Sequence, residues 1–306
     1  MAADTEKSRE LGGSREGGPR SGTLRLERGG QALYGRDRPS NHGIPAPMDL
    51  SPRSLSLGLI GYGHFGAFLH ALAQRYLPEA RLKIHSGRRQ PDGLLFFPLE
   101  EVAACDAVVL AVPISAYGET LARIAPHLGA ATVVVDVATV KQHTMALVQD
   151  LGPERPFLAM HPMFGPESYA KRGGDVAGLR IVLTGHRLAP ALYAAIADKL
   201  AEIGFSVVEK TAETHDRELA ETLFLTHYIG QIVARGGFER TEIDTLSFGY
   251  LMDAVDSVRH DGRLFEEVYR FNPYCREVIE RFDASEGAVR DAMLGLAIQR
   301  RRQATE

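Results

Sequence analysis

Residues 55–66 read LSLGLIGYGHFG, and this stretch decides the fold. Its first six residues are almost continuously apolar, as expected of a strand buried in a parallel sheet. Glycines follow at 61, 63 and 66, and residues 67–76 then have the apolar spacing of a helix. A strand, a glycine turn and a helix in this order are typical of a site that binds the pyrophosphate of a dinucleotide.

Each glycine has its own physical role in such a turn. The first permits the tight turn, the second lets the backbone approach the pyrophosphate, and the third lets the helix pack on the strand. The phosphates then lie at the positive end of the helix. We therefore predict a cofactor turn rather than a purely structural one, made of Gly61, Tyr62, Gly63, His64, Phe65 and Gly66.

The second strand predicts which dinucleotide is bound. Folds that select NAD place an acid about 20 residues after the glycine turn, where it holds the ribose 2′-hydroxyl. Here the second strand runs into His85, Ser86, Gly87, Arg88 and Arg89, with no acid. Because a hydroxyl and two guanidinium groups suit a 2′-phosphate, we predict that Ser86, Arg88 and Arg89 bind NADP, with NAD as the alternative cofactor. The other interpretation is that both arginines belong to a solvated loop.

Further strand signals alternate with helical patterns up to about residue 210. They fall at 81–85, 107–112, 132–137, 157–161, 180–184 and 206–209. Strands alternating with helices imply a mainly parallel sheet covered on both faces. The expected fold class is α/β, a Rossmann-like doubly wound sheet that forms a dinucleotide-binding domain over residues 53–210.

Beyond residue 211 the strand signals largely vanish. Helical patterns follow at 214–235, 245–258, 264–270, 274–282 and 286–300. Several carry apolar residues on more than one face, which suggests burial between subunits. We therefore predict an all-helical second domain over residues 211–306 that binds the substrate and forms a homodimer.

Composition narrows the class of protein. The 306 residues, 44% of them hydrophobic, can bury a sizeable core, and the net charge of -4 offers no basic field for nucleic acid. No apolar run approaches the ~18 residues of a membrane helix. Cys105 and Cys275 lie far apart and lack a metal-ligand spacing, which suits a reducing compartment. We expect a cytoplasmic protein without a metal site and without nucleic-acid or membrane partners.

Residues 1–50 are rich in Gly, Ser, Arg and Pro, which predicts a disordered extension. A transit peptide is the alternative, but such peptides are poor in acids, and this stretch contains Asp4, Glu6, Glu10, Glu16, Glu27 and Asp37. A further hypothesis is that translation begins at Met48, just before the first strand.

A candidate catalytic base follows another apolar strand. His161 begins the tract HPMFGPES at 161–168, and the carboxyl ends of parallel strands face the ligand crevice. An imidazole titrates in the right range to take a hydroxyl proton as a hydride leaves. Thr139 also follows an apolar strand and is expected to orient the substrate hydroxyl or His161. The alternatives are a core histidine and an ordinary helix cap.

These tracts together resemble a known family. GYGHFG at 61–66, DVATVK at 136–141, HPMFGPES at 161–168, and His215-Asp216 followed by Thr226-His227 resemble the prephenate/arogenate dehydrogenases of tyrosine biosynthesis, most of all the plant-type arogenate enzymes. The resemblance implies NADP-dependent oxidative decarboxylation of arogenate to tyrosine. The alternative within the family is conversion of prephenate to 4-hydroxyphenylpyruvate with NAD or NADP.

The resemblance also assigns residues. It gives His161 the position of the catalytic histidine and Thr139 the position of a neighbouring serine, and it makes His227 a substrate contact. His215 and His227 recur on one helix stripe but lie roughly 18 Å apart along an α-helix, too far to share a metal ion. We interpret His215-Asp216 as a helix start or interdomain contact and leave the pair out of the catalytic set.

One departure from the family bears on the substrate. Many prephenate-using members carry an arginine in the second-domain helix, whereas the corresponding stretch 248–255 here reads FGYLMDAV. The resemblance places Asp253 where plant-type arogenate enzymes have an acid. A carboxylate suits the ammonium of arogenate and repels the doubly anionic prephenate. Asp253 is therefore predicted to select arogenate, the alternative being a solvent-facing helix residue.

Other questions stay open from the sequence. Another hydride-transfer enzyme, such as a 3-hydroxyacid dehydrogenase or an imine reductase, leaves the His161 tract unexplained, and a non-catalytic NADP-sensing protein is a less favoured reading. The cation that binds the ring carboxylate is not identified, the candidates being Lys141, Lys171, Arg172 and Arg235.

Overall fold

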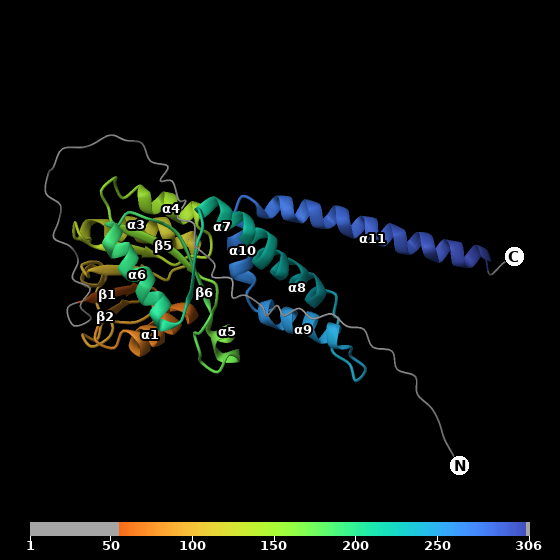
Figure 1. Cartoon of the computed structure of the whole chain (residues 1–306), viewed down its shortest axis with the longest axis horizontal. Helices are drawn as coiled ribbons and strands as arrows, with labels where there is room; N and C mark the ends of the chain where they lie inside the picture. Colours follow the sequence, from red (N-terminus) through yellow and green to blue (C-terminus); the bar gives the residue numbers. More distant parts are fainter. Residues whose placement is uncertain (1–54, 304–306) are drawn as a thin grey trace, which may run out of the picture. The chain divides into compact units, whose positions relative to one another are not determined.

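The computed structural model describes residues 55–303, with side chains over 55–296, and all of these fall in one compact unit (Figure 1). The predicted disorder of residues 1–50 and the proposed start at Met48 lie outside the described residues. Within them the sheet has seven strands in the order β2-β1-β3-β4-β5-β6-β7. The strands are β1 (Ser56–Ile60), β2 (Arg81–His85), β3 (Ala107–Leu110), β4 (Val133–Asp136), β5 (Phe157–Pro162), β6 (Arg180–His186) and β7 (Ser206–Glu209).

The pairing from β2 to β5 is parallel, and only β5 and β6 run antiparallel. A parallel connection needs a helix long enough to return along the strand. The β5–β6 connection holds only the six-residue α5 (Pro166–Lys171), which spans about 9 Å. The chain turns back at this point, and β6 pairs antiparallel with β5. The carboxyl ends of the first five strands share one edge, and the expected α/β, mainly parallel fold is confirmed.

Helices cover both faces of the sheet. One face packs against α2 (Leu99–Ala103), α3 (Tyr117–Ile124) and α4 (Gln142–Gln149), and the other against α1 (His64–Tyr76) and α6 (Pro190–Ile203). Short 3-10 turns flank α3 at Ile114–Ala116 and Ala125–His127. The helix α6 begins with proline at its first turn and ends at Gly204, whose φ of 112° is the left-handed conformation of a helix stop.

The chain beyond β7 is helical in its described part. It forms α7 (Ala212–Leu219), a π-helical segment (Ala220–Phe224), α8 (Leu225–Arg235), α9 (Leu246–Val258), α10 (Gly262–Phe271) and α11 (Cys275–Gln303). Two predicted helices at 274–282 and 286–300 are one 29-residue helix instead. Little tertiary packing reaches the second half of α11, whose side chains are mostly exposed over residues 283–296, so no contact forces a break there.

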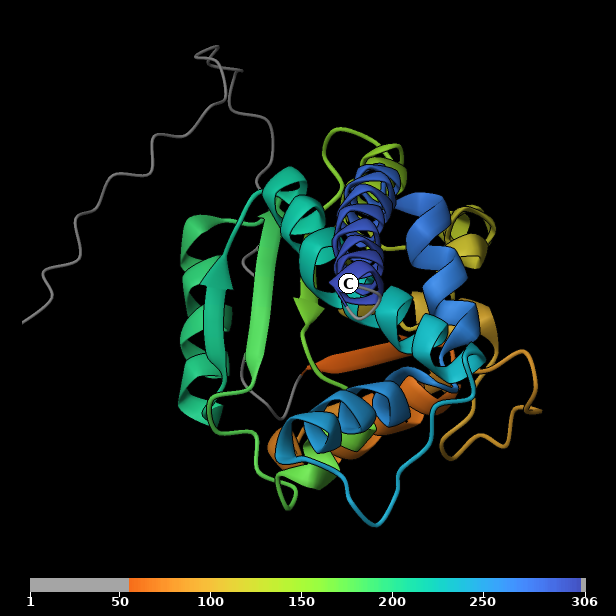
Figure 2. The ribbon, with the colours of Figure 1, turned by 90° about the vertical axis from the view of Figure 1, so that its right-hand side faces the viewer.

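The hydrophobic core on the α3–α4 face continues into these helices. Leu219 and Phe224 from the α7–α8 helix and Val268 from α10 belong to the same buried cluster as Leu110 and Tyr117. Figure 2 looks along α11 from its C-terminal end and shows α10 beside it, and α11 contacts both α10 and the π-helical segment. The α7–α8 helix is thereby held against the carboxyl edge of the sheet, where the candidate site lies.

Candidate active site

The glycine turn has the geometry that its sequence predicts. Gly61 has a φ of 102°, and a Cβ there would collide with the carbonyl oxygen of Ala111. A Cβ at Gly66 would overlap the carbonyl oxygen of Gly61, so the close approach of α1 to β1 requires glycine. Gly63 lies at the start of α1 and has open space where a Cβ would stand. No described residue fills the space beside Gly63, where a pyrophosphate needs close access to the backbone.

The other residues of the turn divide between surface and core. His64 is exposed, whereas Phe65 is half-buried and packs on the core of the α1 face. The Tyr62 hydroxyl lies 3.1 Å from His70 Nδ1, and the Tyr62 ring meets Phe96 edge-on. Phe65 and Tyr62 therefore stabilise the turn through their side chains.

The end of β2 carries the three residues predicted to select NADP. Ser86 is buried, and its Oγ accepts a hydrogen bond of 3.2 Å from the Arg88 amide. Both Arg88 and Arg89 are exposed. The next acid along the chain, Asp92, accepts three backbone N–H bonds from its own loop, which lower the pKa of its carboxyl. The loop thus offers positive charge to a ribose without an available carboxylate of its own.

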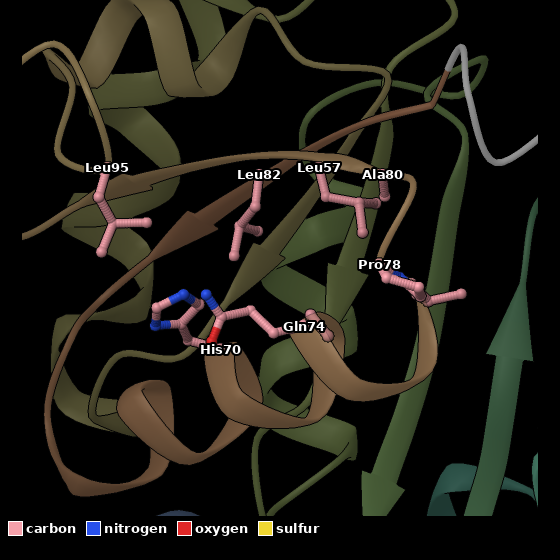
Figure 3. A pocket seen from close by; sticks show the side chains of 9 residues that line it. Leu57, His70, Gln74, Pro78, Ala80, Leu82 and Leu95 are labelled. Carbon is pink, nitrogen blue, oxygen red and sulfur yellow. The ribbon is translucent and has the colours of Figure 1, made fainter.

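A cavity of about 390 Å³ lies between α1 and the β1–β2 edge (Figure 3). His70 and Gln74 from α1 face Leu82 and Leu95 across it. It contains none of the predicted site residues. His70, which lines it, contacts Tyr62 of the cofactor turn.

His161 lies at the carboxyl end of β5, and only 5% of it is exposed. The register of β5 shifts between Ala159 and Met160, and such a bulge re-aims the side chains that follow it. Burial holds the pKa of the His161 imidazole well below its ordinary value, and His215 and Lys141 lower it further. The imidazole is therefore neutral near pH 7, which is the state a base requires.

His161 is connected to two residues of α7. Its Nδ1 lies 2.9 Å from His215 Nε2, and His215 Nδ1 lies 2.8 Å from an oxygen of Asp216. His215 and Asp216 are both buried. The pair is therefore a helix-start and interdomain contact, as the sequence predicts, and it also reaches the candidate base directly, which we did not predict. Sequence spacing could not reveal this, since the contact joins residues 54 positions apart.

Lys141 is not a candidate for binding the substrate carboxylate. It is fully buried, and its ammonium pairs with the Asp136 carboxylate at 2.8 Å. It also donates a hydrogen bond of 2.8 Å to the Met160 carbonyl beside His161. Asp136 also accepts from Tyr117 and Thr144. This network joins β4, α4 and the end of β5, so Lys141 fixes the backbone that carries the base. Lys171, Arg172 and Arg235 are exposed and remain candidates.

Thr139 lies in the turn between β4 and α4 and is half-buried. The start of α4 is capped by Asp216, which accepts from the backbone N–H groups of Lys141 and Gln142 at 2.9 and 2.8 Å. Thr139 is therefore not the helix cap. Its hydroxyl makes no hydrogen bond to any described residue, so it is available to a ligand.

His227 is buried on α8, and its Nδ1 has no hydrogen-bond partner among the described residues. Its ring stacks near Phe265 of α10 at 6.3 Å. Burial lowers the pKa of His227, and the carboxylate of Asp261 opposes that shift. A buried, unpaired imidazole nitrogen is costly unless a ligand satisfies it, which agrees with a substrate contact.

The π-helical segment sets the direction of His227. A stripe of every fourth residue drifts around a regular α-helix, so twelve residues at about 100° each would leave His215 and His227 roughly 120° apart around the axis. The Leu225 amide bonds the Ala220 carbonyl five residues earlier, which takes in about one extra residue and removes about 100° of that offset. Both histidines thereby lie on nearly the same buried side of the helix.

Asp253 lies on α9 and, unlike His161 and His227, it is exposed. Its side chain is 69% exposed, and its carboxylate pairs with Arg240 at 2.7 Å. No hydrogen bond or ion pair among the described residues joins it to His161, His215 or His227.

Residues 55–303 contain no group of three or more His, Cys, Asp or Glu side chains that could hold a metal ion.

Comparison with known proteins identifies the family. Residues 96–184 match the model of the prephenate dehydrogenase nucleotide-binding domain. Arogenate dehydrogenase 2 of Arabidopsis thaliana is 30% identical over 266 residues, which cover 82% of this chain and 73% of that protein. The chain belongs to the prephenate/arogenate dehydrogenase family. It is accordingly an NAD(P)-dependent oxidoreductase with a nucleotide-binding domain, as the sequence predicts.

Other relatives of this dehydrogenase agree. Cyclohexadienyl dehydrogenase of Zymomonas mobilis is 27% identical, with 78% of this chain and 88% of that protein covered. Arogenate dehydrogenase 1 of Arabidopsis thaliana is 29% identical, but the chain spans only 41% of its length. The solved structure of A. aeolicus prephenate dehydrogenase with hydroxyphenyl propionate and NAD+ has a TM-score of 0.63 at 17% identity, covering 82% of this chain and 93% of that one, and it supports the fold.

Proposed function

We propose that this dehydrogenase oxidatively decarboxylates arogenate to tyrosine with NADP, prephenate being the alternative substrate. The observation that carries the proposal is His161, a buried neutral imidazole at the edge of the sheet where the glycine turn also ends. The bound dinucleotide supplies the hydride acceptor. The Arabidopsis relatives named as arogenate dehydrogenases support the choice of substrate.

The residues of the chain account for the proton. His161 Nε2 takes the proton of the 4-hydroxyl as the hydride leaves ring carbon 4, and Thr139 orients that hydroxyl. Loss of carbon dioxide then leaves an aromatic phenolate, which takes the proton back from His161. Because aromatisation drives the reaction, the protein has mainly to position the substrate and hold one proton. His227, with its unpaired Nδ1, contacts the substrate from α8.

The proposal is tested by measuring kcat/KM for arogenate and prephenate, each with NADP and with NAD. Arogenate with NADP is expected to give the highest value. Reduction of the nicotinamide with prephenate alone would shift the assignment to the alternative within the family. Cofactor binding without turnover of either substrate would support the non-catalytic NADP-sensing protein.

The pH dependence of the rate follows from the state of His161. Because the pKa of His161 is lowered, the imidazole loses its proton below the ordinary histidine value of about 6.5. We therefore expect kcat/KM to be level above that pH and to fall only at more acid pH. A measured pH profile that still rises between pH 7 and 9 would contradict His161 as the base.

Cofactor choice is expected to depend on the β2 loop. Replacing Arg88 and Arg89 by alanine should lower kcat/KM with NADP by about 10–100-fold, the worth of charge-assisted hydrogen bonds to a phosphate. The value with NAD should stay within about twofold, because that cofactor lacks the 2′-phosphate. An equal loss with both cofactors would place the two arginines outside the 2′-phosphate site.

Two substitutions test which acid selects arogenate over prephenate. Asp253 is the predicted selector, although its carboxylate would have to exchange Arg240 for the substrate. Asp261 begins α10 one turn before Phe265, which stacks on His227, and its charge acts on His227. With Asp253→Asn, the ratio of prephenate to arogenate efficiency should rise. A rise with Asp261→Asn alone would move the selector to Asp261, and two unchanged ratios would dismiss both.

The two domains are proposed to have separate roles. We assign residues 53–210 to cofactor binding and residues 211–306 to substrate binding and homodimerisation. Exposed apolar side chains on α8, α9 and α11 support an interface there: Ile232, Leu246, Tyr250, Leu251, Val289, Met293, Leu294 and Leu296. Sedimentation velocity that gave a monomer would contradict it.

Among the described helices, none combines the length and the apolar character that a membrane span requires. Both cysteines are free and buried, which agrees with a reducing compartment. A cytoplasmic location is our proposal, and it is checked by cell fractionation, since the Arabidopsis relatives are named chloroplastic.

A further inference from the structure

Two buried hydrogen bonds link His161 to His215 and His215 to Asp216, and the donor of each can be identified. Asp216 accepts three hydrogen bonds, from the Lys141 and Gln142 amides and from His215 Nδ1. The two amides can only donate, and both carboxylate oxygens are thereby used as acceptors. His215 must therefore carry its proton on Nδ1, where the carboxylate receives it.

The direction of the hydrogen bond from His215 to Asp216 fixes the direction of the hydrogen bond between His161 and His215. A neutral His215 with its proton on Nδ1 has a lone pair on Nε2, which faces His161 Nδ1 at 2.9 Å. His161 therefore carries its own proton on Nδ1 and donates it. Its Nε2 is left as an acceptor, and no hydrogen bond from residues 55–296 occupies it. This is the only tautomer of His161 that can take a proton from a substrate hydroxyl.

We propose that His215 and Asp216 are positioning residues that hold His161 in its Nδ1–H tautomer and stabilise the imidazolium formed during the reaction. The inference rests on the proposed function for its kinetic consequence. Of the buried carboxylates near His161, that of Asp136 is paired with the Lys141 ammonium at 2.8 Å. Asp216 is then the carboxylate connected to the imidazolium through a hydrogen-bonded chain.

The same carboxylate makes the base depend on how the helices dock. Asp216 caps α4, and Asn272 donates a hydrogen bond of 2.8 Å to the Asp216 backbone carbonyl, so the residue is held between α4 and the end of α10. A purely structural cap would need Asp216 but would have no use for the acceptor nitrogen of His215. The two roles therefore differ in what replacement of His215 does.

The first test observes the tautomer without any reaction. In the ¹⁵N spectrum of histidine-labelled full-length protein, the His161 signals are those lost in His161→Asn. We expect Nδ1 of His161 to be protonated at pH 7.5, whereas a free neutral imidazole in water prefers Nε2. Protonation of His161 on Nε2 in the resting protein would overturn the proposal, whatever the activity. The Nδ1–H tautomer in a protein without turnover would uphold it and count against the proposed function instead.

The second test uses two substitutions at one position. His215→Phe keeps a ring but removes the acceptor, so kcat is expected to fall by about 10²–10⁴-fold while the Kd for NADP stays unchanged. His215→Gln can accept from His161 through its carbonyl and donate to Asp216 through its amide. It should therefore retain at least tenfold more activity than His215→Phe.

The matched control is His143→Phe, the same exchange at a half-buried histidine of α4 that stacks on Phe271 at 4.5 Å. Its kcat should stay within about twofold of the parent. A His215→Phe enzyme with kcat within threefold of the parent would overturn the proposal. So would equal losses with Phe and Gln, because His215 would then act through packing alone. Should His215→Phe fail to fold, the spectrum of His215→Gln decides, since it must still show the Nδ1–H tautomer of His161.

Discussion

Replacing His161 by asparagine is expected to lower kcat by about 10²–10⁴-fold, the usual contribution of a general base, and to leave the Kd for NADP within about twofold. Asparagine can still donate to His215, but it cannot accept a proton at pH 7. The cofactor turn lies on β1 and α1, and no hydrogen bond among the described residues joins it to His161. The loss should therefore appear in kcat and not in cofactor binding.

His186→Asn is the matched control for this experiment. His186 ends β6, is exposed, and stacks on Tyr193 at 3.9 Å. The same chemical exchange there should leave kcat within about twofold. If His161→Asn kept more than a tenth of the parental kcat, another group would have to be the base, and the chain through His215 would have no catalytic role.

Lys141→Met is expected to lower the free energy of unfolding by about 3–5 kcal/mol, because it leaves the buried carboxylate of Asp136 without its cation. The pair lies entirely out of solvent at 2.8 Å. Tyr117 and Thr144 still donate to Asp136, but neither supplies charge. The measurement is urea unfolding, read as a change in midpoint at constant slope.

Two comparisons show whether the buried pair is the cause. Lys199→Met breaks an exposed pair with Glu202 at 3.1 Å and should cost at most about 1 kcal/mol. The double variant Lys141→Met, Asp136→Asn removes both buried charges and should be less destabilised than the sum of its single changes. Additive losses would mean that the two side chains act independently.

The sheet and the cofactor turn could be predicted from local patterns. Apolar runs such as Val133–Val135 mark buried strands wherever they stand in the chain, and the steric demands on Gly61 and Gly66 come from neighbours within the same strand-turn-helix unit. Pro190 and Gly204 likewise bound α6 by their own backbone preferences. Such signals depend on a few adjacent residues, so they survive without knowledge of the tertiary structure.

The connection from His161 to His215 and Asp216 has no local signal. It arises because α7 docks its first turns against the end of β5 and the start of α4, and the sequence does not specify that docking. The burial of Lys141 was missed for a similar reason, since a lysine after a strand is ordinarily solvated. The π-helical segment also depends on packing, because Phe224 and Leu219 both enter the same core.

The presence of β6 could be predicted from the sequence, but its antiparallel direction could not. The sequence shows a strand at 180–184 after a proline-containing turn, but not its direction. The connection between the two strands contains the six-residue α5, which does not stand out as a helix in the sequence. The direction of β6 matters for the site, because β6 pairs with His161 through Val182 and covers the side of β5 away from β4.

The central claim is that one site removes a hydride and carbon dioxide from the same molecule, with His161 holding the proton between the two events. It is tested most directly by incubating the full-length protein with arogenate and NADP and measuring reduced nicotinamide, carbon dioxide and tyrosine together. The account predicts equal amounts of all three with the parent protein and almost none with His161→Asn. Reduced nicotinamide formed without carbon dioxide, or equal yields from His161→Asn, would contradict it.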